Sequence, residues 1–227
     1  MGQHPIEAQH PIEAESHRII AERIDLSTRP ALHASIVARV IHATADLEYA
    51  GTLTFDPGAA EAGVSALRRR APVICDTEMV RSGITSVDAL CFLRQLPSAC
   101  DPGSTRSAAA MRAAAEQHPT GAIVVVGCAP TALDEVVRLF EGGVFSPQLV
   151  IGAPVGFVGA AEAKQRARDC AGLATITNIG DKGGSAVAAA VINALARAAV
   201  SSVPLPLIGD RDQSRPDLVA LETGGDR

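Results

Sequence analysis

Short apolar runs alternate with helical stretches along most of this chain. The runs have the length of strands buried on both faces, and they lie at 72–76, 122–128, 148–153 and 173–179. The stretches between or beside them predict helices over 30–43, 58–70, 104–117, 130–141, 158–170 and 184–199. Fully buried strands that alternate with helices are typical of a parallel sheet covered by helices on both faces. The sequence therefore predicts an α/β fold with three layers, α/β/α, around a mostly parallel sheet.

The two ends of the chain differ from this middle part. Residues 3–14 contain QHPIEA twice in tandem, with X-Pro breaks and no core-sized apolar face, so we expect a mobile leader over 1–14. Prolines and charged residues collect over 201–227, which indicates a flexible C-terminal tail. A single α/β domain is thus expected over 15–200.

Composition and missing motifs exclude several function classes. The chain has 20 basic and 25 acidic residues, a net charge of −5, and only 3% aromatic residues, which disfavours binding to nucleic acid or to an anionic membrane. Five scattered cysteines without a C-x-x-C pair argue against disulfides and zinc and fit a reducing cytoplasm. No apolar run is long enough to span a membrane. Metal-ligand spacing, a G-x-S-x-G elbow, a P-loop and a G-x-G-x-x-G fingerprint are also absent from the sequence.

Turn-forming and polar residues follow each of the four predicted strands, at 76–78, 127–131, 152–154 and 180–185. In open parallel sheets, ligands bind where the carboxyl ends of the strands lead into loops. The segment from Gly180 to Ser185 could present backbone N–H groups and Lys182 to an anion. By itself, however, it is better interpreted as a tight strand-to-helix turn whose glycines permit close packing.

His42 is expected outside the core. In the helix over 30–43, Ile36, Val37, Val40 and Ile41 cluster on one side, and His42 projects from the other side, roughly in line with Ser35, Ala38 and Arg39. From its position alone, the favoured interpretation is an exposed histidine that interacts with the helix C-terminus. The alternative is an acid/base group that titrates near neutral pH.

The basic residues are nearly all arginines, since only Lys164 and Lys182 are lysines. Arg106 lies in the first turn of a predicted helix, where its charge opposes the helix dipole and needs another partner. That partner is either a ligand carboxylate or a neighbouring acidic residue.

Seven stretches together resemble one family, and they occur in that family's order. They are SHRII (16–20), IVARVIHATAD (36–46), PVICDTEMVRSGI (72–84), TRSAAAM (105–111), GCAPTAL (127–133), GAPVGFVGAAEAK (152–164) and KGGSAVAAAVINAL (182–195). On these motifs, which span roughly residues 15–200, the chain resembles the precorrin-8X methylmutases of corrin-ring biosynthesis.

The resemblance implies a flavodoxin-like fold, a homodimer and a reaction without cofactor or metal. The reaction moves a methyl group from C-11 to C-12 on ring C of a tetrapyrrole, giving hydrogenobyrinic acid or its cobalt form. The family's catalytic histidine falls on His42, which would protonate or hydrogen-bond the ring C nitrogen. The substrate carries many carboxylates, which Arg39, Arg106 and Lys182 are suited to bind.

The same resemblance assigns a larger set of residues to substrate binding. They are Ser16, Arg39, Asp76, Met79, Thr105, Arg106, Ser107, Cys128, Thr131, Lys182, Gly183, Gly184 and Ser185. The chain departs from the family pattern at His17 (usually aromatic), Ala45 (usually Gly), Cys128 (usually Asn) and Asp181 (usually basic). Two functions follow as hypotheses, an active isomerase or a corrinoid-binding carrier derived from it, while an unrelated nucleotide binder is disfavoured.

Overall fold

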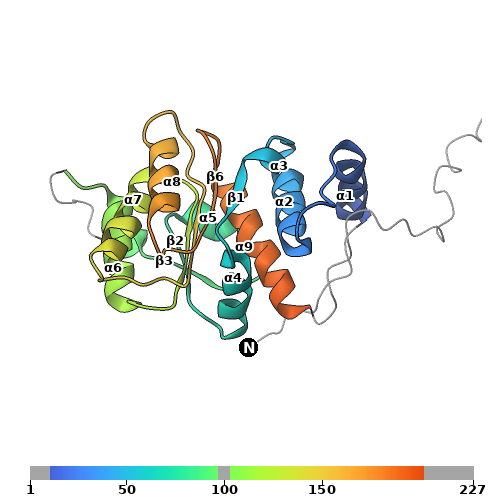
Figure 1. Cartoon of the computed structure of the whole chain (residues 1–227). Coiled ribbons are helices and arrows are strands. Elements are labelled where there is room, and N and C mark those ends of the chain that lie inside the picture. The colour runs from blue at the N-terminus through green and yellow to red at the C-terminus, as the bar shows by residue number, and fades with distance from the viewer. Residues whose placement is uncertain (1–10, 97–102, 202–227) are drawn as a thin grey trace, which may run out of the picture.

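The computed structural model describes residues 11–96 and 103–201. Within them, six strands form one sheet in the order β1-β6-β5-β4-β2-β3 (Figure 1). The strands are β1 (Leu53–Phe55), β2 (Val73–Cys75), β3 (Ala89–Cys91), β4 (Ile123–Val126), β5 (Leu149–Gly152) and β6 (Thr175–Asn178).

The order of the parallel strands defines the topology. Strands β3, β2, β4, β5 and β6 are parallel, and β1 pairs antiparallel with β6 at the edge. Counted along the chain, the parallel strands lie in the order 2-1-3-4-5, which is the flavodoxin-like arrangement. The expected α/β fold is confirmed. The strand order reverses between β2 and β4, so ligand-binding loops are expected at their carboxyl ends.

Helices cover both faces of the sheet, as Figure 1 shows. The helices are α1 (Pro11–Arg23), α2 (Ala31–Thr44), α3 (Tyr49–Thr52), α4 (Ala59–Arg68), α5 (Glu78–Gly83), α6 (Arg106–Gln117), α7 (Pro130–Glu141), α8 (Ala160–Asp169) and α9 (Ser185–Val200), with a short 3-10 turn η1 (Leu93–Gln95). Helices α4, α5 and α9 pack on one face and α6, α7 and α8 on the other. Helix α2 lies against α9, and α1 lies against α2.

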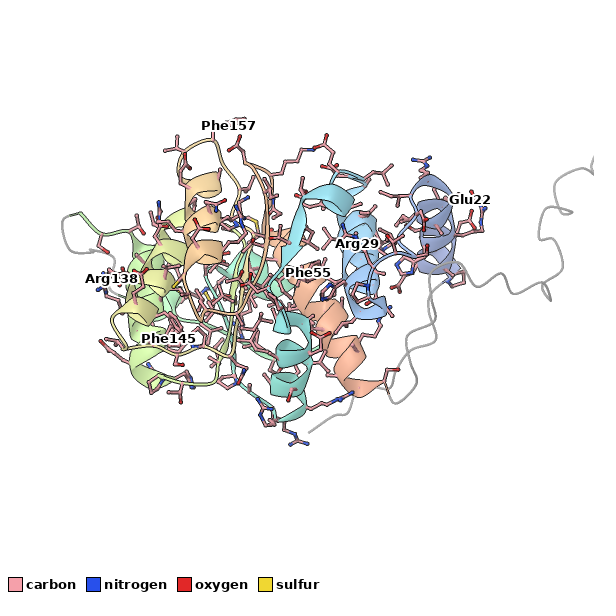
Figure 2. The ribbon with its side chains drawn as sticks, viewed as in Figure 1. Glu22, Arg29, Phe55, Arg138, Phe145 and Phe157 are labelled. Atoms are coloured by element: carbon pink, nitrogen blue, oxygen red, sulfur yellow. The ribbon has the colours of Figure 1, made fainter. Side chains whose placement is uncertain are left out.

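Strand β4 shows why these short runs must be buried on both sides. Its residues Ile123 and Val125 pack in the core beneath α4, α5 and α9, whereas Val124 and Val126 pack beneath α6, α7 and α8. Phe145 joins the second core, on the α6–α8 side of Figure 2. Side chains alternate between the faces of a strand, so a strand covered on both sides has no polar face.

The elements that the apolar pattern predicts are all present, with ends that differ by at most two residues. The pattern misses the three-residue edge strands β1 and β3 and the helices α1, α3 and α5, because these are too short or too polar to give a clear periodicity. Residues 11–14, which we expected in a mobile leader, form the first turn of α1 instead. Residues 1–10 and 202–227 lie outside the described part of the chain. Among the described helices, none has the length and apolar character needed to cross a membrane.

Candidate active site

The loops after β2 and β4 are joined by a buried carboxylate. Asp76 is fully buried and accepts backbone hydrogen bonds from Gly127 (3.2 Å), Cys128 (2.8 Å) and Ala129 (2.8 Å). Burial raises the pKa of Asp76, and the three N–H donors oppose that rise without cancelling it. Its burial and contacts give Asp76 a positioning function, holding the Cys128 loop, which differs from the substrate contact expected for it.

Other predicted site residues meet along the same edge of the sheet. The Thr77 hydroxyl donates to Cys128 Sγ at 3.2 Å, across the point where the strand order reverses. The hydroxyls of Thr105 and Thr131 lie 2.7 Å apart and join the first turns of α6 and α7. The structure thus brings 105 and 131 together, although they are far apart in sequence.

The glycine-rich segment, residues 180–184, lies next to these loops. A Cβ atom at Gly127 would approach Ser185 Cα to 3.0 Å, so α9 begins directly against the loop after β4. At Gly183, where φ is +157°, a Cβ would meet the Ala153 carbonyl oxygen at 2.3 Å. Glycine is therefore required by close packing at both positions, which is the interpretation that the segment alone favoured.

His42 lies in the last turn of α2 and is half-buried. Its Nδ1 is 2.7 Å from Ser16 Oγ on α1, and its ring contacts the His17 ring edge-on with centroids 5.7 Å apart. His42 lies outside the core, as the helical phase read from the sequence predicts, but Ala38, expected on the same side, is buried in the core. The interpretation as a freely exposed helix-end histidine is wrong, because α1 covers part of the ring. Ser16 leaves Nε2 as the ring nitrogen available to a ligand.

Charged residues surround this pair of imidazoles. Glu13 on α1 accepts from Arg39 at 2.5 Å and from Arg197 on α9 at 2.8 Å. Burial raises the pKa of Glu13, but the hydrogen bond from Arg197 and the charges of both arginines outweigh it and keep the pKa below its usual value. Burial also lowers the pKa of His17, and the Glu13 carboxylate only partly opposes this effect. Arg39 is thus held by a carboxylate that it shares with Arg197, which restrains its expected contact with substrate.

Lys182 links the glycine-rich segment to the His42 helix. Its Nζ lies 2.6 Å from Asp46 Oδ2 and 2.8 Å from Glu48 Oε2, just after α2. These two hydrogen bonds raise the pKa of Lys182, which stays charged at any physiological pH. Ala45 joins the end of α2 to Asp46 with a left-handed φ of +55°, and glycine is better suited to this backbone.

Arg106 and the residues around it are accessible. Arg106 is exposed and donates to the Leu93 carbonyl at 3.1 Å, and no acidic side chain in the described part of the chain pairs with it. A backbone carbonyl thus takes the place of the acidic neighbour considered from the sequence. Ser107 is half-buried beside it, and Met79 at the start of α5 is 67% exposed.

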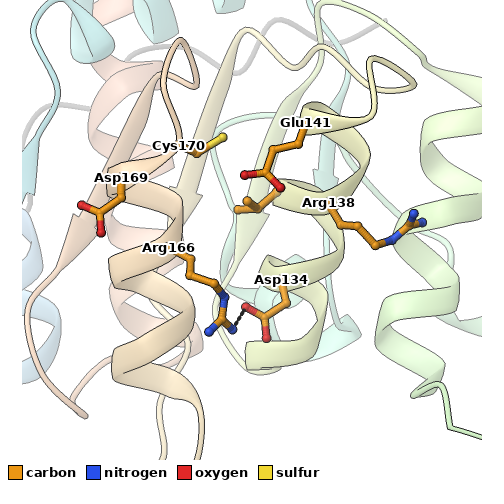
Figure 3. Close-up of a pocket in the computed structure, with 7 residues that line it drawn as sticks. Asp134, Arg138, Glu141, Arg166, Asp169 and Cys170 are labelled. Carbon is orange, nitrogen blue, oxygen red and sulfur yellow. Dashed lines mark hydrogen bonds and ion pairs between the residues drawn. The ribbon is translucent and has the colours of Figure 1, made fainter.

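Two surface cavities lie on the α6–α8 side of the sheet. One, of about 440 Å³, lies between α7 and α8, where Arg166 pairs with Asp134 (Figure 3). The other, of about 290 Å³, is lined partly by Thr105 and Thr131. The first cavity is lined by none of the predicted site residues, and the second borders the predicted site through Thr105 and Thr131; neither is lined by His42 or by residues 182–185. Within residues 11–96 and 103–201, no cluster of three or more potential metal ligands occurs.

Several contributors to this site are not singled out by sequence reasoning. They are Glu13, Asp46, Glu48 and Lys164, together with the contact of His17 with His42. Asp46 offers a weak local signal, because it follows His42 by four residues and ends a matched motif. Lys164 also ends a matched motif, whereas Glu13 and Glu48 offer no such signal, since their partners come from distant parts of the chain.

Fold and site together define a class: a flavodoxin-like α/β protein with a histidine outside its core and a ligand edge built from the loops after β2, β4 and β6. Comparison with known proteins makes this specific. The family profile described as precorrin-8X methylmutase matches residues 11–198. The chain therefore belongs to the precorrin-8X methylmutase family.

Individual relatives agree with this assignment. The chain is 40% identical over 195 residues to the precorrin-8X methylmutase of Pseudomonas aeruginosa, covering 82% of this chain and 93% of that protein. It is 42% identical over 163 residues to the cobalt-precorrin-8 methylmutase of Methanocaldococcus jannaschii, covering 70% and 77%. The crystal structure of the precorrin-8X methylmutase from Thermus thermophilus superposes with a TM-score of 0.76 at 36% identity, covering 83% of this chain and 95% of that one.

Proposed function

We propose that this protein is an isomerase that moves a methyl group from C-11 to C-12 on ring C of precorrin-8X or cobalt-precorrin-8, without a cofactor. The observation that carries the proposal is His42 in a chain of this family: half-buried, outside the core, and hydrogen-bonded at Nδ1 by Ser16. The relatives from Pseudomonas aeruginosa and Methanocaldococcus jannaschii are themselves named methylmutases, so the alternative of a non-catalytic corrinoid carrier is not favoured.

His42 acts as the acid in this proposal. An imidazolium can donate through Nδ1 to Ser16 Oγ and still offer Nε2–H to the nitrogen of ring C. Protonation or hydrogen bonding of that nitrogen draws electron density from the ring, which favours migration of the methyl group. Ser16 is a positioning residue, because it fixes the orientation of the imidazole and which of its nitrogens faces the substrate.

The substrate carboxylates need cations at the ligand edge. Among the three basic residues proposed to bind them, Arg39 is held by Glu13, and Lys182 is held by Asp46 and Glu48. Arg106 keeps an exposed guanidinium with only a carbonyl partner among the described residues. We therefore propose Arg106 as the principal carboxylate contact, with Thr105, Ser107 and Thr131 beside it.

Arg106→Ala is expected to weaken tetrapyrrole binding about two- to fivefold at low ionic strength, the size typical of an exposed charge contact. The difference from wild type should shrink as salt screens the interaction. Absorbance titrations at several salt concentrations measure it. Arg69→Ala, which removes the same charge from the end of α4 beside Gln148, serves as control. Equal affinities of Arg106→Ala and wild type at low salt would remove Arg106 from the site.

Asp181→Arg is expected to tighten tetrapyrrole binding by about 0.2–1 kcal/mol, because an exposed negative charge next to Lys182 gives way to a positive one. Cys128→Asn should act in the same direction, since an amide both donates and accepts hydrogen bonds better than a thiol. Binding constants for both single variants and the double variant provide the measurement. If neither substitution changes affinity, the loops after β4 and β6 are remote from the substrate.

Turnover itself is tested by incubating the purified protein with the metal-free and the cobalt-containing tetrapyrrole and following the absorption spectrum. A rearranged chromophore demonstrates the isomerase, whereas a bound and unchanged chromophore demonstrates a carrier. The two substrates, assayed in parallel, distinguish the precorrin from the cobalt-precorrin.

We also propose that the protein works as a homodimer in the cytoplasm. The loop after β5 exposes the apolar residues Val155, Phe157 and Val158, and Phe157 is 94% exposed at the top of Figure 2. Exposed apolar side chains clustered in one loop favour coverage by a partner. Light scattering after size-exclusion chromatography tests the oligomeric state.

A further inference from the structure

Lys164 is a charged residue that the fold removes from solvent. It lies on α8, and its side chain is fully buried. No carboxylate in the described part of the chain forms an ion pair with it; its Nζ donates instead to the Lys182 backbone oxygen at 2.5 Å and to Asn178 Oδ1 at 3.3 Å. Burying an ammonium group without a counter-charge is costly, so an apolar side chain would be the cheaper way to fill this space.

The carbonyl that Lys164 binds lies in the middle of the glycine-rich segment. Asn178 Nδ2 also donates to this oxygen, at 2.7 Å, so two side chains hold a single peptide group. The segment is held on its other side by the loop after β5, because Gly156 N donates to the Asp181 oxygen at 3.1 Å and Gly184 N donates to the Ala153 oxygen at 2.8 Å. The path of residues 181–184 is thus specified from α8, β6 and the loop after β5.

Lys182 has a second set of contacts, which its side chain makes with the segment after α2. Its Nζ binds Asp46 and Glu48, and Asp46 follows His42 by four residues. Lys164 therefore contacts the backbone of Lys182, whose side chain ties the glycine-rich segment to the end of the His42 helix.

We propose that Lys164 is a positioning residue for the methylmutase reaction: its ammonium group holds the Lys182 carbonyl, and so sets the glycine-rich segment and the Lys182–Asp46 link in the geometry that accepts the tetrapyrrole. The inference rests on the proposed function, in which this segment borders the substrate. Lys164 does not touch the reacting atoms and acts only through residues 181–184 and Asn178.

Protonation gives this role a distinctive signature. Burial lowers the pKa of Lys164 to about 8; the charge of Arg168 on the same helix acts in the same direction, and Asp181 opposes it. The side chain of β6 that hydrogen-bonds Lys164 Nζ, Asn178, is neutral. Above that pH Lys164 becomes a neutral amine, which donates a weaker hydrogen bond to the Lys182 carbonyl. The geometry of the segment should therefore loosen as the pH rises through about 8.

The test compares Lys164→Met with wild type, because methionine fills similar space without a donor. We expect a KM for the tetrapyrrole raised about tenfold, with a smaller change in kcat, since a charge-assisted hydrogen bond is lost away from the reacting centre. In wild type, KM should rise as the pH passes about 8, and in Lys164→Met it should be insensitive to pH in that range. Arg166→Met, on the exposed side of the same helix, is the matched control and should keep the wild-type profile.

A second variant keeps the proposal testable if Lys164→Met does not fold. Asp181→Asn removes the charge that raises the pKa of Lys164, so the midpoint of the KM profile should move to lower pH. Hydrogen exchange of the 181–184 amides, corrected for the intrinsic effect of pH, should increase through the same midpoint. A wild-type pH profile and wild-type KM in Lys164→Met would overturn the proposal, as would an unmoved midpoint in Asp181→Asn.

Failure of the proposed function is recognised separately. If the wild-type protein binds the tetrapyrrole without converting it, the isomerase assignment fails. The effect of Lys164 is then measured on the binding constant and on amide exchange instead. Unchanged binding and unchanged exchange in Lys164→Met would then reject Lys164 as a positioning residue.

Discussion

His42→Ala is expected to reduce methyl migration by about 10²–10⁴-fold, the usual contribution of a general acid or base, while the fold stays intact. The imidazole lies outside the apolar face of α2, so its removal opens no cavity in the core. Single-turnover absorption spectroscopy measures the rate, and circular dichroism with thermal unfolding checks the fold.

Ser16→Ala is the informative companion to this variant. It removes the hydroxyl 2.7 Å from Nδ1 but leaves the imidazole in place, so a smaller loss of rate is expected. Wild-type turnover in His42→Ala would show that another group is the acid. A loss of folding would instead show that the half-buried ring packs as a core residue.

Asp76→Ala is expected to destabilise the protein by about 3 kcal/mol or more, because three backbone N–H groups lose their common acceptor at a cost of about 1–3 kcal/mol for each buried donor. Urea unfolding followed by circular dichroism measures the change. Substrate affinity should fall as well, since the Cys128 loop loses its anchor.

Asp76→Asn keeps the shape of the side chain but removes its charge, so it tests the two contributions to stability separately. The amide oxygen can still accept, so the loss of stability should be smaller than in Asp76→Ala. Burial raises the folded-state pKa of Asp76 above its unfolded value, so its ionisation costs stability as the pH rises through that pKa. The stability advantage of wild type over Asp76→Asn should therefore be larger at acid than at neutral pH. An Asp76→Ala protein as stable as wild type would contradict the anchoring role.

The local pattern of apolar residues was enough to predict most of the strands and helices of the fold. The run AIVVVGC predicts a strand buried on both faces, and β4 is such a strand, with alternate residues in two separate cores. Helix α7 has the predicted ends because Pro130 starts it and Gly142 follows it. The edge strands β1 and β3 escape detection, because three residues with one poorly covered side carry little periodicity.

For the candidate site as well, the sequence predicted some features and the tertiary structure was needed for the others. Periodicity alone placed His42 off the apolar face of its helix, and the matched motifs pointed to Ser16, Lys182 and Cys128 as binding residues. The tertiary structure decided what these residues contact: Ser16 orients His42, and Asp46 holds Lys182. It also showed that Asp76 and Lys164 are buried and hold loops.

The physical reason is the range of the interactions. Periodicity records which side of an element is buried, because neighbouring residues on one helix or strand share an environment. A contact such as Lys182–Asp46 joins residues 136 positions apart, and it forms where β1, which follows α2 and α3 in the chain, pairs with β6. The sequence by itself thus determined the layers of this protein and the position of its histidine outside the core, whereas the partners that give each polar side chain its function were decided only by the tertiary structure.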